Sequence, residues 1–291
     1  MERITANGVD FAYLDDGPRD GPLALCLHGF PDHAPTWSGL LPALAAGGFH
    51  AVAPWMRGYA PTAVPADGRY QSAALALDAL ALADGLAGDG DAVIVGHDWG
   101  AIAAYNAVAH RPDRFSRAVT LAVPHLAALG LRLFLTPAQL KRSWYMFFFQ
   151  QPVAEMAVAH DDYAFIEMLW RDWSPGYTPD PSFMRALKDT FAAPGCLTAA
   201  LDYYRATFQP DRQDPALASV QAAAAAPVPV PALYLHGVDD GCMGADLFTP
   251  DELQPSFAKG VEVEVVPGTG HFLHLEAPDV VNRRIIEFLT G

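Results

Sequence analysis

The 291-residue sequence contains few cysteines, few positive charges and no long apolar run. Its three cysteines are odd in number and lack the spacing of a metal site, which predicts a reduced protein. Lysine and arginine total 18 against 33 acidic residues, and the net charge of −15 disfavours nucleic acid and anionic membranes as partners. Because no basic-then-apolar leader and no membrane-spanning stretch is present, we expect a cytoplasmic protein.

The sequence also lacks the Gly-x-Ser-x-Gly pattern that places a serine nucleophile on a strand-to-helix turn. Instead, Gly96-His97-Asp98-Trp99-Gly100 follows the apolar run 92–95, so an aspartate occupies the centre of such a turn. A serine that opened an alkyl electrophile would be left as a stable ether, whereas a carboxylate becomes an ester that water can cleave. The aspartate therefore predicts hydrolysis of carbon–oxygen or carbon–halogen bonds and excludes an ordinary serine esterase.

Short apolar strands alternate with helical stretches over the first 125 residues and again from about residue 229. This alternation predicts an α/β protein whose mostly parallel sheet is covered on both faces. Residues 126–228 are dense in aromatic side chains and lack β-branched runs, so we expect an all-helical cap inserted into a core of residues 1–125 and 229–291. The expected strands are 9–14, 23–27, 51–53, 92–95, 118–123, 232–236 and 261–266, and the expected core helices are 37–46, 75–86, 101–110 and 278–289.

A nucleophile on this turn needs a base, and the base needs a group that orients it. His271 follows the last expected strand after a glycine-rich turn, and it is the candidate base. The candidate orienting acid is Asp240, in the loop after the strand 232–236, with Asp239 as an alternative. The other position that such an acid can take, after the strand 118–123, holds no carboxylate.

Cleavage of an ester also needs hydrogen-bond donors for the oxyanion that forms on its carbonyl. One candidate is the backbone amide of Trp99, directly after the aspartate. The second is the amide of Phe30, in the segment His28-Gly29-Phe30-Pro31 that follows the strand 23–27. Both amides are expected at the carboxyl ends of neighbouring strands.

These motifs, together with Arg57-Gly58-Tyr59, make the sequence similar to the epoxide hydrolase and haloalkane dehalogenase branch of the α/β-hydrolase superfamily. The resemblance covers essentially the whole core and implies an α/β-hydrolase fold with a mostly parallel eight-stranded sheet. It also implies a covalent alkyl-enzyme ester on Asp98 that is hydrolysed by water activated by His271. Neither a metal nor an organic cofactor is implied.

The resemblance extends to the cap, where epoxide hydrolases of this family supply two tyrosines that protonate the departing alkoxide. Tyr145 matches the first, because a Phe-Gln pair follows it, and Tyr204 in a Tyr-Arg dipeptide matches the second. Tyr203 is an alternative for the second position. The implied product is a vicinal diol. The aromatic residues expected to line the substrate pocket are Trp144, Phe148, Phe149, Trp173 and Phe272.

A haloalkane dehalogenase with the same aspartate nucleophile is the main alternative. Its halide needs N–H donors, and the tryptophan after the aspartate, Trp99, is a feature shared with haloalkane dehalogenases. For the second donor, the Phe30 side chain offers no N–H group, which leaves Trp144 as a weak candidate. A third hypothesis is a non-catalytic hydrolase fold that binds a hydrophobic ligand, against which the intact catalytic set argues. The expected partners are a small apolar epoxide and water, without nucleic acid or membrane, and a homodimer is compatible with the sequence.

Overall fold

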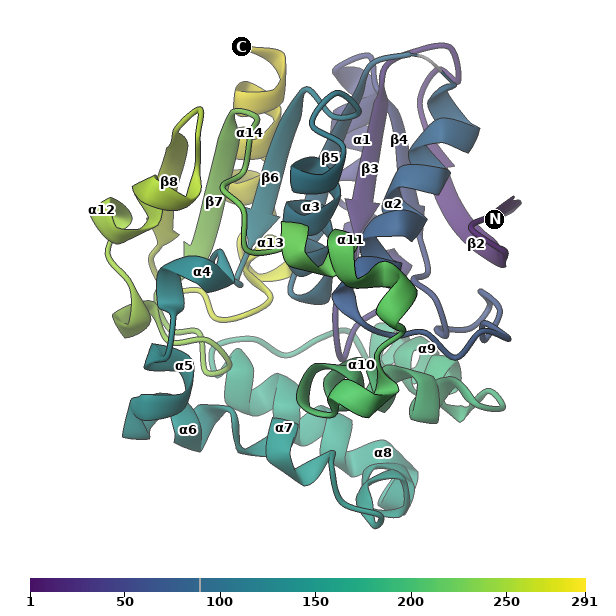
Figure 1. The fold of residues 1–291 in the computed structure, drawn as a ribbon, viewed down its shortest axis with the longest axis vertical. Helices are drawn as coiled ribbons and strands as arrows, with labels where there is room; N and C mark the ends of the chain where they lie inside the picture. Colours follow the sequence, from purple (N-terminus) through teal and green to yellow (C-terminus); the bar gives the residue numbers. More distant parts are fainter. Residues whose placement is uncertain (89) are drawn as a thin grey trace.

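The computed structural model describes residues 1–88 and 90–291 and contains an eight-stranded sheet in the order β1-β2-β4-β3-β5-β6-β7-β8 (Figure 1). The β1–β2 and β2–β4 pairs are antiparallel and the other neighbouring pairs are parallel. The predicted mostly parallel eight-stranded sheet is therefore confirmed. The strands are β1 (Glu2–Ala6), β2 (Val9–Asp16), β3 (Leu23–Leu27), β4 (His50–Pro54), β5 (Ala92–His97), β6 (Arg117–Leu121), β7 (Ala232–Gly237) and β8 (Val261–Val266).

The central strands are covered by helices on both faces. Every residue of β3, β4 and β5 is buried, which explains why these strands are mainly apolar instead of alternating between apolar and polar residues. In Figure 1, α2 (Ser72–Ala87) and α3 (Trp99–His110) lie in front of the sheet and pack against each other. On the other face, α1 (Leu41–Ala46) contacts α14 (Pro278–Thr290).

The observed elements differ from the sequence prediction mainly near the N-terminus. The antiparallel edge strand β1 was not predicted, because most of its residues are at least partly exposed and it lacks an apolar run. The expected helix 37–46 is split into a 3₁₀ turn, η1 (Ala34–Trp37), and the short helix α1. Each piece has a proline in its first turn, where the missing N–H is tolerated, so the prolines begin two separate elements.

Between β6 and β7 the chain forms helices that make a second lobe beside the carboxyl ends of the parallel strands (Figure 1). The last of them, α11, belongs to the predicted cap segment but packs against α2 and α3 of the core. Among the described residues, no helix combines the length and hydropathy needed to cross a membrane. The helices are α4 (Leu126–Leu129), α5 (Arg132–Leu135), α6 (Pro137–Arg142), α7 (Trp144–Phe148), α8 (Ala154–Trp173), α9 (Pro181–Ala192), α10 (Cys196–Phe208) and α11 (Ala218–Ala223).

The end of α8 fixes this lobe to the core. The Trp170 indole lies parallel to the Phe272 ring, with centroids 3.6 Å apart, and its N–H donates to the Pro31 carbonyl at 2.8 Å. The carbonyl of Trp173 accepts hydrogen bonds from the backbone amides of Gly241 at 3.1 Å and His271 at 3.0 Å. The lobe is therefore anchored to three loops at the edge of the sheet where the parallel strands end.

Candidate active site

Asp98 lies at the end of β5 on a turn that glycines on both sides make possible. Its backbone has φ 53° and ψ −117°, a conformation that costs a non-glycine residue about 1–3 kcal/mol. A Cβ atom on Gly96 would collide with the Gly100 carbonyl, and one on Gly100 would collide with the Leu27 carbonyl. The tight turn therefore requires small residues two positions before and after the aspartate, and it presents the Asp98 carboxylate at the start of α3.

The carboxylate of Asp98 is held by the loop that follows β3. The Phe30 amide donates to Asp98 Oδ1 at 2.8 Å. A side chain on Gly29 would overlap the same carboxylate, so the loop can approach only because this residue is glycine. Trp99 is the first residue of α3, and its amide therefore has no partner within the helix. The two amides predicted as oxyanion donors thus come from the two elements that flank the Asp98 carboxylate.

His271 connects the two buried carboxylates predicted from the strand ends. Its Nδ1 is 2.9 Å from Asp240 Oδ2, and its Nε2 is 3.6 Å from Asp98 Oδ2. The His271 side chain is fully buried, and its Nε2 has no hydrogen-bond partner among the described residues. One ring nitrogen is therefore fixed by Asp240 while the other is directed at the reacting carboxylate.

The loop after β7 decides between the two neighbouring aspartates. Asp239 is exposed, whereas the Asp240 side chain is fully buried. The second oxygen of Asp240, Oδ1, accepts hydrogen bonds from the backbone amides of Cys242 at 2.7 Å and Met243 at 2.9 Å. These donors leave Oδ2 facing His271, so the geometry favours Asp240 over Asp239 as the orienting acid.

The two carboxylates control the protonation of His271. Burial alone would lower the pKa of His271, but the charges and hydrogen bonds of Asp240 and Asp98 outweigh it and raise the pKa to about 10. At neutral pH the free protein therefore holds this side chain as an imidazolium. Loss of the negative charge on Asp98 would remove one of the two groups that retain the proton.

We therefore expect an Asp98→Asn variant to lower the pKa of His271 from about 10 toward its ordinary value near 6.5. The amide resembles an ester at this position because it is neutral. An NMR titration of the imidazole resonances measures the change. Asp239→Asn is the matched control, since this exposed neighbour should leave the pKa unchanged. A His271 pKa that stays near 10 in Asp98→Asn would contradict the assigned coupling.

Both candidate tyrosines of the cap are buried beside the nucleophile, with ring centroids 5.6 Å apart. The Tyr145 hydroxyl is 3.4 Å from Cys242 Sγ, and the Tyr204 hydroxyl has no hydrogen-bond partner among the described residues. The Tyr203 hydroxyl instead donates to the Arg57 carbonyl at 2.9 Å. Burial raises the pKa of Tyr145 and Tyr204 well above the usual value, so both remain protonated phenols. The geometry thus favours Tyr204 over Tyr203.

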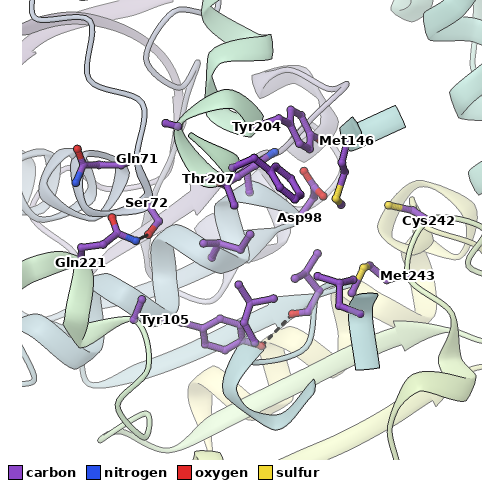
Figure 2. A pocket seen from close by; sticks show the side chains of 18 of the residues that line it. Gln71, Ser72, Asp98, Tyr105, Met146, Tyr204, Thr207, Gln221, Cys242 and Met243 are labelled. Atoms are coloured by element: carbon purple, nitrogen blue, oxygen red, sulfur yellow. Dashed lines mark hydrogen bonds between the residues drawn. The ribbon is translucent and has the colours of Figure 1, made fainter. Parts of the chain in front are cut away.

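A cavity of about 200 Å³ separates the core from the cap and has Asp98, Tyr145 and Tyr204 in its wall (Figure 2). Cys242 lies in the same wall, and burial raises the pKa of its thiol well above the usual value. Sequence reasoning missed Cys242, although its position two residues after the orienting acid could have indicated it. The apolar wall includes Ile102, Leu126, Leu133, Phe134, Phe208 and Met243.

The five aromatic residues predicted to line the pocket do not line this cavity, and this part of the prediction differs from the structure. Phe149 and Phe272 are 0% exposed and pack inside the protein. Trp173 packs edge-on against His271 at 5.0 Å between ring centroids. Trp144 and Phe148 contact each other, and Trp144 is 41% exposed. The helix α7 turns its next residues, Tyr145 and Met146, toward the cavity, so aromatic density alone did not identify the lining.

Two groups of potential metal ligands occur in the described residues. In the first, Cys242 joins the Asp98–His271 pair, and its protonated thiol is a poor ligand. In the second, the ring nitrogens of His97 and His274 are partly occupied, by the His271 carbonyl at 2.9 Å and the Thr36 hydroxyl at 2.6 Å. The proposed chemistry needs no metal ion at either group. That the protein requires no metal stays a prediction.

The sequence profile of the alpha/beta hydrolase family matches residues 24–284. This chain belongs to the alpha/beta hydrolase family. It is 30% identical to the epoxide hydrolase of Caballeronia sordidicola over 98% of this chain and 92% of that protein. It is also 30% identical to epoxide hydrolase A of Mycobacterium tuberculosis, over 99% and 96% respectively.

The fold comparison agrees with these relatives. The crystal structure of epoxide hydrolase A from Mycobacterium thermoresistibile has a TM-score of 0.81 to this hydrolase at 25% identity, covering 100% of this chain and 98% of that chain. The predicted resemblance to the epoxide hydrolase branch and the predicted α/β-hydrolase fold are therefore confirmed. The chain is a hydrolase of the epoxide hydrolase group.

Proposed function

We propose that this hydrolase converts an epoxide to a vicinal diol through a covalent ester on Asp98. The observation that carries the proposal is that an aspartate with a buried histidine 3.6 Å from its carboxylate lines the same cavity as two tyrosines. The names of the relatives support the same reaction class. The substrate expected from the apolar wall is a mainly hydrophobic epoxide.

In the first step, an oxygen of Asp98 attacks the less hindered carbon of the epoxide and the carbon–oxygen bond of the ring breaks. The departing alkoxide is a poor leaving group, so it needs a proton as the ring opens. Tyr145 and Tyr204 can supply hydrogen bonds and that proton, since a phenol is more acidic than an alkyl alcohol in the same buried environment. The products of this step are a hydroxyalkyl ester and a tyrosinate.

Ester formation removes the negative charge of Asp98, and His271 then gives up its proton more readily. Transfer of this proton to the tyrosinate restores the phenol and leaves a neutral imidazole. The imidazole takes a proton from water, which attacks the ester carbonyl, while Asp240 stabilises the imidazolium that forms. The amides of Phe30 and Trp99 stabilise the oxyanion. Collapse of this intermediate breaks its bond to the alkyl oxygen, and the departing alkoxide takes the remaining proton of the attacking water and leaves as the diol. One oxygen from water stays on the restored Asp98 carboxylate.

Turnover in ¹⁸O-labelled water tests the ester mechanism. With enzyme in excess over epoxide, the first turnover should place the heavy oxygen in Asp98 and leave the diol unlabelled, as determined by mass spectrometry of the Asp98 peptide and of the product. Label that enters the diol directly, with no label in Asp98, would show that water attacks the epoxide itself. Halide release from bromoalkanes without diol from any epoxide would favour the dehalogenase alternative.

The dehalogenase alternative finds little support in the site. The Phe30 side chain has no N–H group to hold a halide. Trp99 lines the cavity and offers one N–H group, but Trp144, the candidate for the second donor, is 41% exposed and does not line the cavity that contains Asp98. Tyr145 and Tyr204 line that cavity instead, and a phenol hydroxyl suits an alkoxide that must be protonated.

Removing either cavity hydroxyl should slow epoxide opening. We expect Tyr145→Phe and Tyr204→Phe each to lower kcat/KM for an epoxide by roughly a hundredfold, since each removes a donor to the alkoxide. Steady-state diol formation measures the effect. Tyr203→Phe is the matched control, because the Tyr203 hydroxyl contacts the Arg57 carbonyl and should be nearly silent in this assay. A larger loss in Tyr203→Phe than in Tyr204→Phe would reverse the assignment.

A further inference from the structure

The cavity has a second polar region, which the ester mechanism does not use. Figure 2 shows Gln71, Ser72 and Gln221 grouped on the side of the cavity away from Tyr204 and Cys242. Gln71 and Ser72 come from the start of α2, and Gln221 comes from α11, which packs on α2. Polar side chains thus meet at the far end of a cavity whose intervening wall is largely apolar.

The hydroxyl of Ser72 carries an unused donor at this end. Its Oγ accepts a hydrogen bond from Gln221 Nε2 at 2.7 Å and lies 3.4 Å from Asn106 Nδ2. The Gln221 amide is fixed from its other side, because its Oε1 accepts from the Ala73 amide at 3.1 Å. Two neighbouring donors therefore orient the Ser72 oxygen, and no contact among the described residues uses its hydroxyl hydrogen.

Gln71 supplies a second donor beside Ser72. Its Oε1 accepts from the Asp214 amide at 2.6 Å, whereas its Nε2 makes only a 3.5 Å contact with the Asp214 carbonyl. The side-chain amide therefore has an N–H group that remains available. Gln71 is 1% exposed and Ser72 is 8% exposed, so both side chains are buried.

The charge of the cavity restricts what these donors can bind. Asp98, at the catalytic end, is the single charged residue in the described lining. A carboxylate on the substrate would meet no cation, and an ammonium group would have no anion at the Ser72 end. A neutral oxygen that accepts hydrogen bonds, such as that of an ether, a carbonyl or a hydroxyl group, fits both the donors and the absence of charge.

We propose that Gln71 and Ser72 form a subsite for a neutral oxygen at the end of the substrate opposite its epoxide. The substrate class is then an epoxide on an apolar chain whose other end carries an ether, carbonyl or hydroxyl oxygen. The apolar side chains between the two ends, among them Ile102, Phe134 and Phe208, contact the chain itself. This inference rests on the proposed epoxide hydrolysis and adds a substrate preference to it.

Two series of terminal epoxides of increasing chain length test the subsite, one ending in a methyl group and the other in a methoxy group. At the length that spans the cavity, we expect the methoxy compound to have about tenfold higher kcat/KM than its hydrocarbon counterpart, the contribution of one or two hydrogen bonds. An ω-carboxylate of the same length should be a poorer substrate than either.

Ser72→Ala should abolish the methoxy preference, which is measured as the ratio of the two kcat/KM values in one preparation. Ser116→Ala is the matched control. Ser116 lies directly before β6, at the amino ends of the parallel strands and away from the cavity, so its replacement should leave that ratio unchanged. Equal kcat/KM values for both series at every length in the unaltered protein would overturn the subsite. Retention of the preference in Ser72→Ala would overturn the role of Ser72. Absence of diol from every epoxide would instead refute the proposed function.

Discussion

A His271→Gln variant should accumulate an ester on Asp98 and stop there. In the proposed mechanism the histidine is the base for the second step, whereas ring opening uses only the Asp98 carboxylate and the tyrosine hydroxyls. Intact-mass spectrometry after mixing with an epoxide should show an increase equal to one epoxide molecule, because the whole substrate is retained in the ester. Steady-state turnover should fall by about 10²–10⁴-fold, the usual contribution of a general base.

Peptide mapping should place the adduct on Asp98, and a second substitution, Asp98→Ala, should abolish both the adduct and turnover. His110→Gln is a suitable control, because His110 lies at the last turn of α3 and away from the cavity. Retained turnover in His271→Gln, or an adduct on another residue, would refute the assigned base and nucleophile. The geometry predicts the opposite, since Nε2 of His271 faces the Asp98 carboxylate at 3.6 Å.

Acidification from pH 7 to pH 5 should strongly destabilise the folded protein. Burial lowers the pKa of His28 and His125 to about 4 and the pKa of His33 and His274 to about 3. The unfolded chain titrates these groups near 6.5, so it binds more protons than the folded chain below that pH. The stabilisation from neutral histidines is therefore fully present above pH 6.5 and is lost as the pH falls toward 3–4.

Two other groups change the stability of the folded protein in the opposite direction as the pH falls. Burial raises the pKa of Asp32 to about 7, so its protonated form favours the folded state below that pH. The raised pKa of His271, about 10, gives a contribution that is complete below pH 6.5 and disappears as the pH rises through 10. Asp32 and His271 offset part of the loss from the four histidines, while burial also lowers the pKa of His97 and His236 and adds to it. We therefore expect a net loss on the order of 5 kcal/mol between pH 7 and pH 5.

Urea denaturation at a series of pH values measures this loss. His125→Phe should reduce the slope of the free energy of unfolding against pH, because it removes one titrating group. His110→Gln should leave the slope unchanged, since this residue is only partly buried. A loss of this size is comparable with the whole stability of many domains. A free energy of unfolding that is constant from pH 7 to pH 5 would show that the buried histidines are protonated in the folded state.

The residues proposed to be catalytic could be predicted from sequence because each follows a strand of the sheet. Parallel strands end at the same edge, so Asp98, Asp240 and His271 had to converge once the strands were recognised. The choice between Asp239 and Asp240 could not be made in this way. It depends on which carboxylate the backbone amides after β7 bury, and that follows from the path of the loop.

The substrate cavity was not predictable in the same way. Its walls are formed largely by short helices. Which side of each helix is buried depends on contacts between residues far apart in the sequence, such as those between α11 and α2. Gln71 and Gln221 are 150 positions apart, and no local pattern links them. Aromatic composition indicated that the cap is packed, but Phe149 and Phe272 fill the interior and the wall is formed by residues such as Leu133 and Phe134.

The hydrogen bonds to the Trp173 carbonyl have a consequence for protein engineering. One backbone oxygen of the cap accepts from Gly241, beside the orienting acid, and from His271 itself. No side-chain replacement removes a carbonyl, so alanine scanning of the cap would pass over this contact. A cap transplanted from a relative would have to reproduce the backbone at this position to keep both catalytic loops in place. The cap of this hydrolase is therefore not a freely exchangeable module.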